Sequence, residues 1–235
     1  MENLFYQPGI NQGTYYLSPE ESKHCIRVLR KKNGDSIILT DGSGNFYNAL
    51  ITDDNANQCQ FTVQDTWQEP TKKFSIHLAI SPTKNPDRIE WMVEKCVELG
   101  IDQITFLNCK NTERQTLKYE RIVKISLSAM KQSFRATAPI IGPLISFQEF
   151  VNISPLTNSE SFIAIVDTAN SYHLLSAAKP GQQYVVLIGP EGDFTPDELT
   201  TALAKGYKKV SLGNNRLRTE TAGLAACHIL NLVNT

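Results

Sequence analysis

The chain has 235 residues, of which 41% are hydrophobic and 20% charged, and its formal net charge is −1. This length suits one large domain, or a medium domain joined to a small one. The near-neutral charge excludes a global attraction to nucleic acid, so any binding of a polyanion must come from local basic patches. Because no run of eighteen apolar residues and no basic leader with an apolar core occurs, we expect a cytoplasmic protein without membrane association.

The cysteines point to a reducing compartment and away from a metal site. They are five in number and scattered, and no two form a C-x-x-C pair: Cys25, Cys59, Cys96, Cys109 and Cys227. An odd, dispersed set of thiols is typical of reduced cysteines in a cytoplasm. We therefore expect no metal cofactor.

The first 70 residues predict a small β-rich domain. Ser18-Pro19-Glu20-Glu21 has the pattern of a capping box, so a short helix should run from there to about Arg30. Apolar segments at 36–40 and 46–51 flank a glycine-bearing turn and predict a hairpin, and a third strand should follow at 60–65. A small β-barrel over residues 1–70 is the natural interpretation, with 67–70 as a linker.

Two local clusters of basic residues could bind RNA. On the predicted first helix, Lys23, Arg27 and Arg30 share one face and are followed by Lys31. A second basic run spans residues 110–135. Both clusters have an alternative interpretation as solvated helix faces. The candidate RNA contacts are Lys23, His24, Arg27, Arg30, Lys31, Arg114 and Gln132.

From residue 73 the pattern changes to alternating strands and helices. Strands are expected at 74–80, 103–107 and 162–166, and a helix should begin at Asn85-Pro86 and stop at Gly100. A long basic helix should span about 117–134. Short apolar strands separated by helices are typical of a parallel sheet that is covered on both faces, so we expect an α/β domain over residues 73–235.

The first of two glycine-bearing loops follows an apolar strand at 184–188. It reads Gly189-Pro190-Glu191-Gly192, and a capping box at Thr195–Glu198 opens the next helix. The spacing matches neither of the common phosphate-binding motifs, which excludes a standard kinase, GTPase or nicotinamide dehydrogenase. Glu191 would repel a phosphate and suits a cationic or hydroxyl-rich ligand better. The alternative is a turn without any ligand.

The second loop repeats this plan after an apolar strand at 208–212. Gly213 to Leu217 lead into Arg218-Thr219-Glu220-Thr221-Ala222 at a helix start. Plain capping, with Thr219 as N-cap and Glu220 in the first turn, is one explanation. Capping does not explain Arg218, because a cation is disfavoured at the positive end of a helix unless an anion lies nearby. Each of the two loops presents free backbone amides at a helix start, and together they suggest one cofactor bound between the loops.

These motifs resemble those of the ribosomal RNA small-subunit methyltransferase E family, which belongs to the SPOUT class of methyltransferases. The resemblance rests on 188–192 and on 212–222, and it extends along the chain through four further motifs in family order: His24 with Val28-Leu29-Arg30, Asp41-Gly42-Ser43-Gly44, Glu94–Gly100 and Gln132-Ser133-Phe134-Arg135. The paired C-terminal motifs are highly specific. Two positions depart from the family pattern, with Asp193 in place of a usual glycine and Arg216 in place of a usual aliphatic residue.

The resemblance implies a fold and an activity that composition cannot show. The fold would be α/β, a SPOUT-type parallel sheet with a trefoil knot, preceded by a small PUA-like β-barrel that binds RNA. The cofactor would be S-adenosyl-L-methionine, and the enzyme would be a homodimer whose partner completes the active site. Its reaction would be the methylation of N3 of a uridine in 16S rRNA of the small ribosomal subunit.

The candidate site residues combine the motifs with this resemblance. Those expected to bind the cofactor are Gly189, Pro190, Glu191, Gly192, Leu212, Gly213, Leu217, Arg218, Thr221 and Ala222. Arg218 or Arg135 could stabilise charge that develops on the base, and Glu220 is a candidate proton acceptor. Two alternatives remain open: a SPOUT enzyme of another RNA site, and an inactive RNA-binding protein of ribosome assembly. The sequence leaves open whether free rRNA or the assembled subunit is the substrate.

Overall fold

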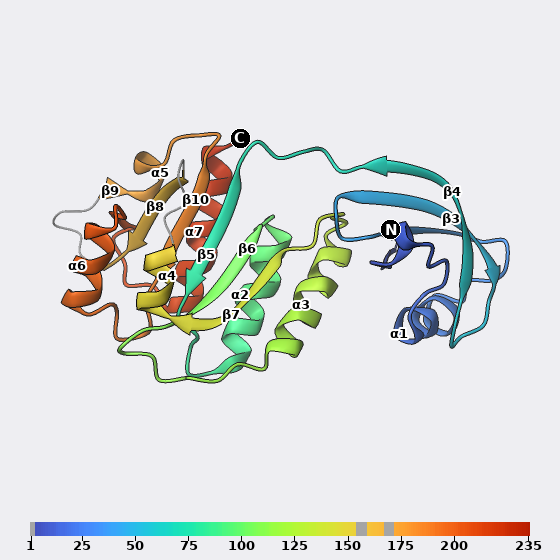
Figure 1. Cartoon of the computed structure of the whole chain (residues 1–235), viewed down its shortest axis with the longest axis horizontal. Helices are drawn as coiled ribbons and strands as arrows, with labels where there is room; N and C mark the ends of the chain where they lie inside the picture. The colour runs from blue at the N-terminus through green and yellow to red at the C-terminus, as the bar shows by residue number, and fades with distance from the viewer. Residues whose placement is uncertain (1–2, 154–158, 167–171) are drawn as a thin grey trace. The chain divides into compact units, whose positions relative to one another are not determined.

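The computed structural model describes residues 3–153, 159–166 and 172–235 and divides the chain into two compact units (Figure 1). The first unit comprises Met1–Thr71 together with Leu127–Ala138. The second comprises Lys72–Ser126 and Pro139–Thr235. Each unit has its own sheet and its own buried core.

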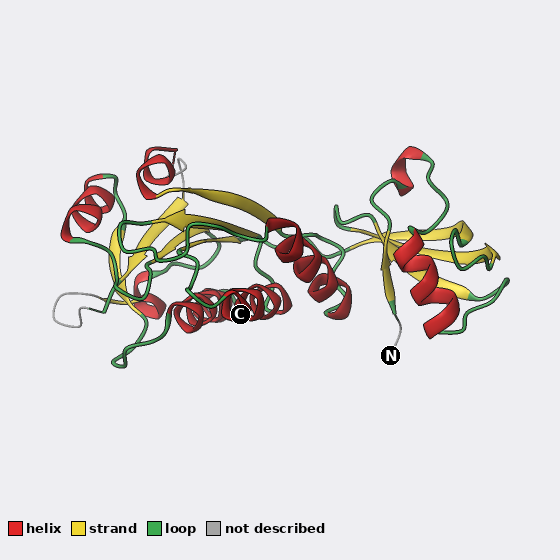
Figure 2. Cartoon of the chain, turned by 90° about the horizontal axis from the view of Figure 1, so that it is seen from below, coloured by secondary structure: helices red, strands yellow, loops and turns green. Residues whose placement is uncertain are grey.

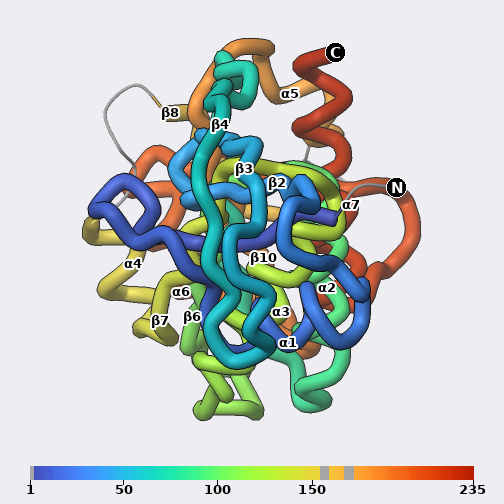
Figure 3. The backbone as a smooth tube through the Cα atoms, turned by 90° about the vertical axis from the view of Figure 1, so that its right-hand side faces the viewer, coloured from blue at the N-terminus to red at the C-terminus, as the bar shows by residue number. Residues whose placement is uncertain are grey.

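The first unit is built on a four-stranded sheet in the order β1-β2-β3-β4, of which β2, β3 and β4 are labelled in Figure 3. Its strands are β1 Leu4–Tyr6, β2 Ser36–Thr40, β3 Asn45–Asp53 and β4 Gln60–Gln68. β1 pairs parallel to β2, and the other two pairs are antiparallel, which confirms the expected hairpin and third strand. One face of the sheet carries the core, in which Phe5, Leu39 and Ile51 are fully buried.

The first helix is shorter and less regular than expected. α1 (Pro19–Lys23) begins as predicted, with Ser18 Oγ accepting from Glu21 N at 3.2 Å, but it widens into a π-helical turn at His24–Val28. The helical segment therefore reaches Val28, near the expected end at about Arg30, but its last turn is π-helical, and Arg30 has a φ of 58°. Because a π-turn changes the residue spacing, Lys23, Arg27 and Arg30 do not form the regular stripe that α-helical spacing predicts.

The end of helix α3 (Tyr119–Gln132) carries a complete Schellman motif in the first unit. Arg135 N donates to Met130 O and Phe134 N to Lys131 O, and Phe134 holds the left-handed position with a φ of 55°. This position is usually glycine, because the left-handed conformation costs another residue about 1–2 kcal/mol. The contact of Phe134 with Phe46 offsets this cost, because a stacked aromatic pair contributes about 0.5–1.5 kcal/mol in addition to the burial of its surface.

The second unit contains a seven-stranded sheet in the order β7-β6-β5-β10-β8-β11-β9. The strands are β5 Ser75–Ile80, β6 Gln103–Asn108, β7 Ile140–Ser146, β8 Ser159–Ala164, β9 Tyr172–His173, β10 Gln183–Ile188 and β11 Lys208–Ser211. Every pair of neighbouring strands is parallel, so the parallel sheet is confirmed. β7 has no counterpart among the sequence predictions.

Helices cover both faces of this sheet (Figure 2). α4 (Phe147–Ile153) and α6 (Pro196–Ala204) share one core with Leu107, Ile163 and Leu187. On the other face, α2 (Pro86–Glu98) packs on α7 (Thr219–Val233), and Gly223 lets α7 approach β5 closely, since a Cβ there would lie 2.8 Å from Ile80 Cδ1. The short α5 (Leu174–Ala177) contacts the same helix α7.

Local sequence signals place the starts of α2 and α6 correctly. Asn85 Oδ1 accepts from Asp87 N at 2.9 Å at the start of α2. Thr195 and Glu198 form the predicted reciprocal capping box of α6. Both helices have proline in the first turn, where its missing N–H costs no hydrogen bond.

Three further properties can be stated for the described residues. Within residues 3–153, 159–166 and 172–235, no helix has the length and apolar character to cross a bilayer. The same ranges contain no group of three side chains suited to a metal ion. All five cysteines are free and buried, and burial raises the pKa of the Cys109 thiol to about 12, so this thiol is no nucleophile at neutral pH.

His77 on β5 predicts a pH dependence of stability. Burial lowers the pKa of its imidazole from 6.5 to about 4, and its Nε2 lies 2.8 Å from Thr105 Oγ1. The unfolded chain therefore takes up a proton near pH 6.5 and the folded chain only near pH 4, so the free energy of unfolding falls as the pH drops through this window. The loss reaches about 3 kcal/mol at most. Urea unfolding between pH 4 and 7 should give a flatter profile for His77→Gln than for the wild type, and parallel profiles would contradict this role.

Candidate functional site

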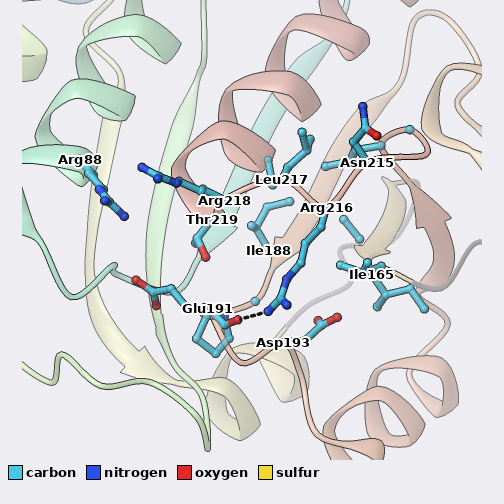
Figure 4. A pocket seen from close by; sticks show the side chains of 17 residues that line it. Arg88, Ile165, Ile188, Glu191, Asp193, Asn215, Arg216, Leu217, Arg218 and Thr219 are labelled. Atoms are coloured by element: carbon cyan, nitrogen blue, oxygen red, sulfur yellow. Dashed lines mark hydrogen bonds between the residues drawn. The ribbon is translucent and has the colours of Figure 1, made fainter.

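A pocket of about 570 Å³ lies at the carboxyl ends of the central strands of the second unit (Figure 4). Its wall begins with Ala164 and Ile188, the last residues of β8 and β10, and continues into the loops that follow β10 and β11. The volume is in the range of small-molecule sites. This is the position at which open α/β sheets bind ligands.

The loop after β10 is a tight turn with two carboxylates. Asp193 N donates to Pro190 O at 2.9 Å, and Asp193 has a φ of 60°, in the left-handed region where glycine is usual and aspartate is tolerated. Glu191 Oε1 accepts from Lys84 N at 3.1 Å, whereas Glu191 Oε2 is buried without a hydrogen-bond partner among the described residues. A buried carboxylate oxygen of this kind lacks the partner that burial normally requires, and a bound ligand could supply it.

The loop after β11 closes the opposite wall. Gly213 has a φ of 128°, a conformation in which other residues are strained. Arg216 extends along the pocket, and its Nη2 donates to the main-chain oxygen of Glu191 at 3.1 Å, as the dashed line in Figure 4 shows. Arg216 therefore links the loop after β11 to the loop after β10 through this hydrogen bond.

The start of α7 differs from the expected cap. The N-cap is Arg218, which makes no capping side-chain bond, so the alternative that explained these residues by plain capping through Thr219 is wrong. Thr219 and Glu220 are both buried. Glu220 lies in the first turn of α7, where the helix dipole favours a carboxylate.

Arg88 is a site residue that the sequence did not reveal. It lies in the first turn of α2, lines the pocket, and its Nε is 3.7 Å from Glu220 Oε1. The second oxygen of Glu220 is buried and has no hydrogen-bond partner among the described residues. The Arg218 side chain points toward that of Arg88 in Figure 4, so two guanidinium groups lie along one side of the pocket.

Most of the residues expected to bind a cofactor line this one pocket. They are Gly189, Pro190, Glu191, Leu212, Gly213, Leu217, Arg218 and Ala222. Gly192 and Thr221 are not part of the lining. The Gly192 carbonyl accepts from Asn111 Nδ2 at 3.3 Å, and Thr221 is exposed on α7. The lining adds Arg88, Ile165 and Asn215, which were not expected.

The remaining candidate residues are divided between the two units. Glu220 lies in the second unit with Arg218, whereas Arg135 belongs to the first. In the first unit the candidate RNA contacts Lys23, His24, Arg27, Arg30 and Gln132 are exposed, and Lys31 Nζ donates to Ser36 O at 3.0 Å. Arg114 belongs to the second unit, where its guanidinium donates to Thr116 O and Lys84 O at 3.0 and 3.1 Å.

The fold and the pocket agree with matches to two family models. Residues 70–231 match an RNA methyltransferase domain. Residues 17–64 match an RNA methyltransferase PUA domain. The first match covers more than half of the chain and shows that the chain is an RNA methyltransferase by family.

Individual relatives narrow this class. The chain is 30% identical over 216 residues to ribosomal RNA small subunit methyltransferase E of Rickettsia conorii, covering 89% of this chain and 86% of the relative. A probable rRNA-methyltransferase from Porphyromonas gingivalis is 42% identical in structural alignment, with a TM-score of 0.92 over 99% and 98% of the two chains. Ribosomal RNA small subunit methyltransferase E from Neisseria gonorrhoeae, solved bound to S-adenosyl methionine, is 26% identical, with a TM-score of 0.88 over 100% and 98%. The chain belongs to the ribosomal RNA small subunit methyltransferase E family, which confirms the resemblance seen in its motifs.

Proposed function

We propose that this chain transfers a methyl group from S-adenosyl-L-methionine to N3 of a uridine in 16S rRNA. The observation that carries the proposal is the pocket formed by the two glycine-bearing loops at the carboxyl ends of β10 and β11. Membership of the family and the cofactor-bound Neisseria structure support the activity and the cofactor. The methylated atom and the base are those that the resemblance implies.

The pocket has the chemical features that this cofactor requires. Ile188, Leu212 and Leu217 provide apolar walls for an adenine ring, and the main-chain groups of the loops provide donors and acceptors beside them. Glu191 brings a buried, unpartnered carboxylate oxygen to the same wall, which suits a ribose hydroxyl or a sulfonium charge. We therefore assign these residues to cofactor binding.

The side chains at the start of α7 fit the chemistry of the base. A bound S-adenosyl-L-methionine supplies an electrophilic methyl group, and uridine must lose its N3 proton when it is methylated. Arg218, which lines the pocket, is suited to stabilise negative charge that develops on the base oxygens. The burial of Glu220 and its pairing with Arg88 favour a positioning role for this carboxylate over the role of proton acceptor.

The resemblance extends the proposal beyond a single chain. It implies a homodimer whose partner completes the active site. Arg135 stays the alternative to Arg218 as the cation at the base, and we take the assembled small subunit, in the cytoplasm, as the proposed substrate. The trefoil knot also stays a prediction. The PUA match supports RNA binding by the first unit, in which Lys23, Arg27 and Arg30 are the proposed phosphate contacts.

Calorimetric titration with S-adenosyl-L-methionine separates this proposal from that of an inactive RNA-binding protein. We expect one saturable site per chain. The absence of binding at millimolar cofactor would contradict the assignment of the pocket and favour the assembly-factor alternative. S-adenosyl-L-homocysteine, which lacks the methyl group and the sulfonium charge, is expected to compete for the same site.

The basic residues of the first unit predict a steep salt dependence of RNA affinity. The slope of log K against log salt should fall in magnitude by about 1 for each cation removed from a phosphate group. Lys23→Ala and Arg27→Ala are therefore each expected to flatten the slope by about this amount when filter binding is measured from about 50 to 300 mM KCl. Lys205→Ala, an exposed cation of the second unit, serves as the control. Slopes that equal that of the wild type would show that Lys23 and Arg27 do not bind phosphate.

A further inference from the structure

Two oppositely charged side chains face the pocket without an ion-pair partner. Asp193 lines it from the loop after β10, and Arg216 lines it from the loop after β11. Among the described residues, neither forms an ion pair, with the other or with a third residue. In Figure 4 their charged groups lie at the same end of the pocket, whereas those of Arg88 and Arg218 lie at the other end. This end of the pocket therefore presents one cation and one anion to a ligand.

Local hydrogen bonds orient both groups and use only part of each. Arg216 Nη2 donates to the main-chain oxygen of Glu191 at 3.1 Å, an uncharged acceptor that does not neutralise the guanidinium. Asp193 Oδ1 accepts from Phe194 N at 2.8 Å. The other nitrogens of Arg216, and Asp193 Oδ2, have no hydrogen-bond partner among the described residues. Because a guanidinium carries five N–H donors and a carboxylate two acceptor oxygens, both groups can bind a ligand as well.

The amino-acid portion of S-adenosyl-L-methionine carries the complementary charges. Its α-carboxylate and its α-ammonium are attached to one carbon, so a single small group presents an anion and a cation. A guanidinium binds a carboxylate through as many as two parallel hydrogen bonds, and a carboxylate accepts from an ammonium. Two other charged groups of the lining already have contacts: Arg88 Nε lies 3.7 Å from Glu220 Oε1, and Glu191 Oε1 accepts from a main-chain N–H.

We propose that Arg216 and Asp193 bind the amino-acid portion of the cofactor, Arg216 through the α-carboxylate and Asp193 through the α-ammonium. The inference rests on the proposed function in taking an S-adenosyl nucleoside as the ligand of the pocket. It adds the two side chains that recognise the zwitterion. Both residues depart from the usual pattern of the family, so this contact would be particular to chains that carry the two charges.

Arg216→Ile tests the contact with the α-carboxylate, and an aliphatic residue is usual at this position. The ligands are S-adenosyl-L-homocysteine and its decarboxylated analogue, with affinities measured by calorimetry. The wild type is expected to bind the analogue about 5- to 10-fold more weakly, as for a charged hydrogen bond that is partly exposed. In Arg216→Ile this ratio should fall to about 1, whereas a general loosening of the loops would weaken both ligands equally and cancel in the ratio. A ratio equal to that of the wild type would overturn the proposal.

Asp193→Asn tests the contact with the α-ammonium in the same way. Asparagine removes the charge and tolerates the left-handed conformation, in which Asp193 has a φ of 60°. The ratio of affinities for S-adenosyl-L-homocysteine and its analogue without the amino group is expected to be about 5 to 10 in the wild type and about 1 in the variant. An unchanged ratio in the variant would contradict the role of Asp193.

Arg218→Ala is the control, because Arg218 is the other cation of the lining for which the structure gives no ion pair among the described residues. This variant should keep the carboxylate ratio of the wild type. Loss of the ratio in Arg218→Ala but not in Arg216→Ile would place the α-carboxylate at Arg218 and overturn the proposal.

The wild type alone separates this inference from the proposed function. If it binds S-adenosyl-L-homocysteine and both analogues with equal affinity, the amino-acid portion makes no charged contact and the inference fails, while the proposed function stands. If it binds neither S-adenosyl-L-methionine nor any of these ligands, the proposed function itself fails.

Discussion

Arg218→Ala is expected to lower the turnover of methyl transfer about 10²- to 10³-fold, the loss typical of removing one charge-stabilising donor from an active site. Arg218 lines the pocket at the start of α7, and its side chain points toward Arg88. Charge on the uridine oxygens grows as N3 loses its proton, so the cation acts mainly in the transition state. Cofactor affinity, measured by calorimetry, should change less than about threefold, because a group that acts in the transition state contributes little to binding.

The comparison of turnover with affinity decides this assignment. Arg218→Lys keeps the charge but loses the planar guanidinium, and it is expected to restore part of the turnover. Lys205→Ala, which changes an exposed cation after α6, should leave both quantities unaltered. If Arg218→Ala lowered cofactor affinity and turnover by the same factor, Arg218 would be a binding residue and its catalytic role would be wrong.

Ala222→Phe is expected to weaken the binding of S-adenosyl-L-methionine at least about 100-fold, or roughly 2.7 kcal/mol. Ala222 lies in the first turns of α7 and lines the pocket. Side chains on a helix lean toward its N-terminus, so the ring would extend toward the loop at 212–218 and occupy the space between the two walls. Ala222 is only partly buried, so the fold should tolerate the substitution.

His228→Phe provides the matched control for this steric effect. His228 is exposed on the same helix, outside the pocket lining, and the phenylalanine ring replaces an imidazole there. Cofactor affinity of His228→Phe should equal that of the wild type, and the melting temperatures of the two variants should be similar. Tight cofactor binding by Ala222→Phe would show that the ligand lies elsewhere.

Local patterns in the sequence predict the parts of this fold that depend on neighbouring residues. Asn85 and Thr195 mark helix starts because their side chains bind the backbone two or three residues away. The strand at 184–188 is predicted by its apolar run. β7 was missed because Gly142 and Pro143 interrupt its pattern, although Gly142 is needed there: a Cβ would lie 2.7 Å from Thr105 Oγ1 of the neighbouring strand.

In the site too, residues within contiguous motifs were predicted, whereas a residue brought in by tertiary packing was not. Glycines and polar residues around 189–192 and 213–222 indicated the pocket because the residues of each loop are contiguous in the sequence. Arg88 could not be found in this way, since it lies far from Glu220 in the sequence and approaches it only through the packing of α2 on α7. Arg216 is a departure from the family pattern, but only the folded loops show that it binds the main chain of Glu191.

Methyl transfer to small-subunit RNA tests the central claim most directly. The protein would be incubated with labelled S-adenosyl-L-methionine and with small subunits from cells that lack the modification, and in parallel with free 16S rRNA. Mapping of the labelled base is expected to place the methyl group on N3 of a single uridine, with Arg218→Ala nearly inactive. Label on another base, or none in either RNA under saturating cofactor, would contradict the account.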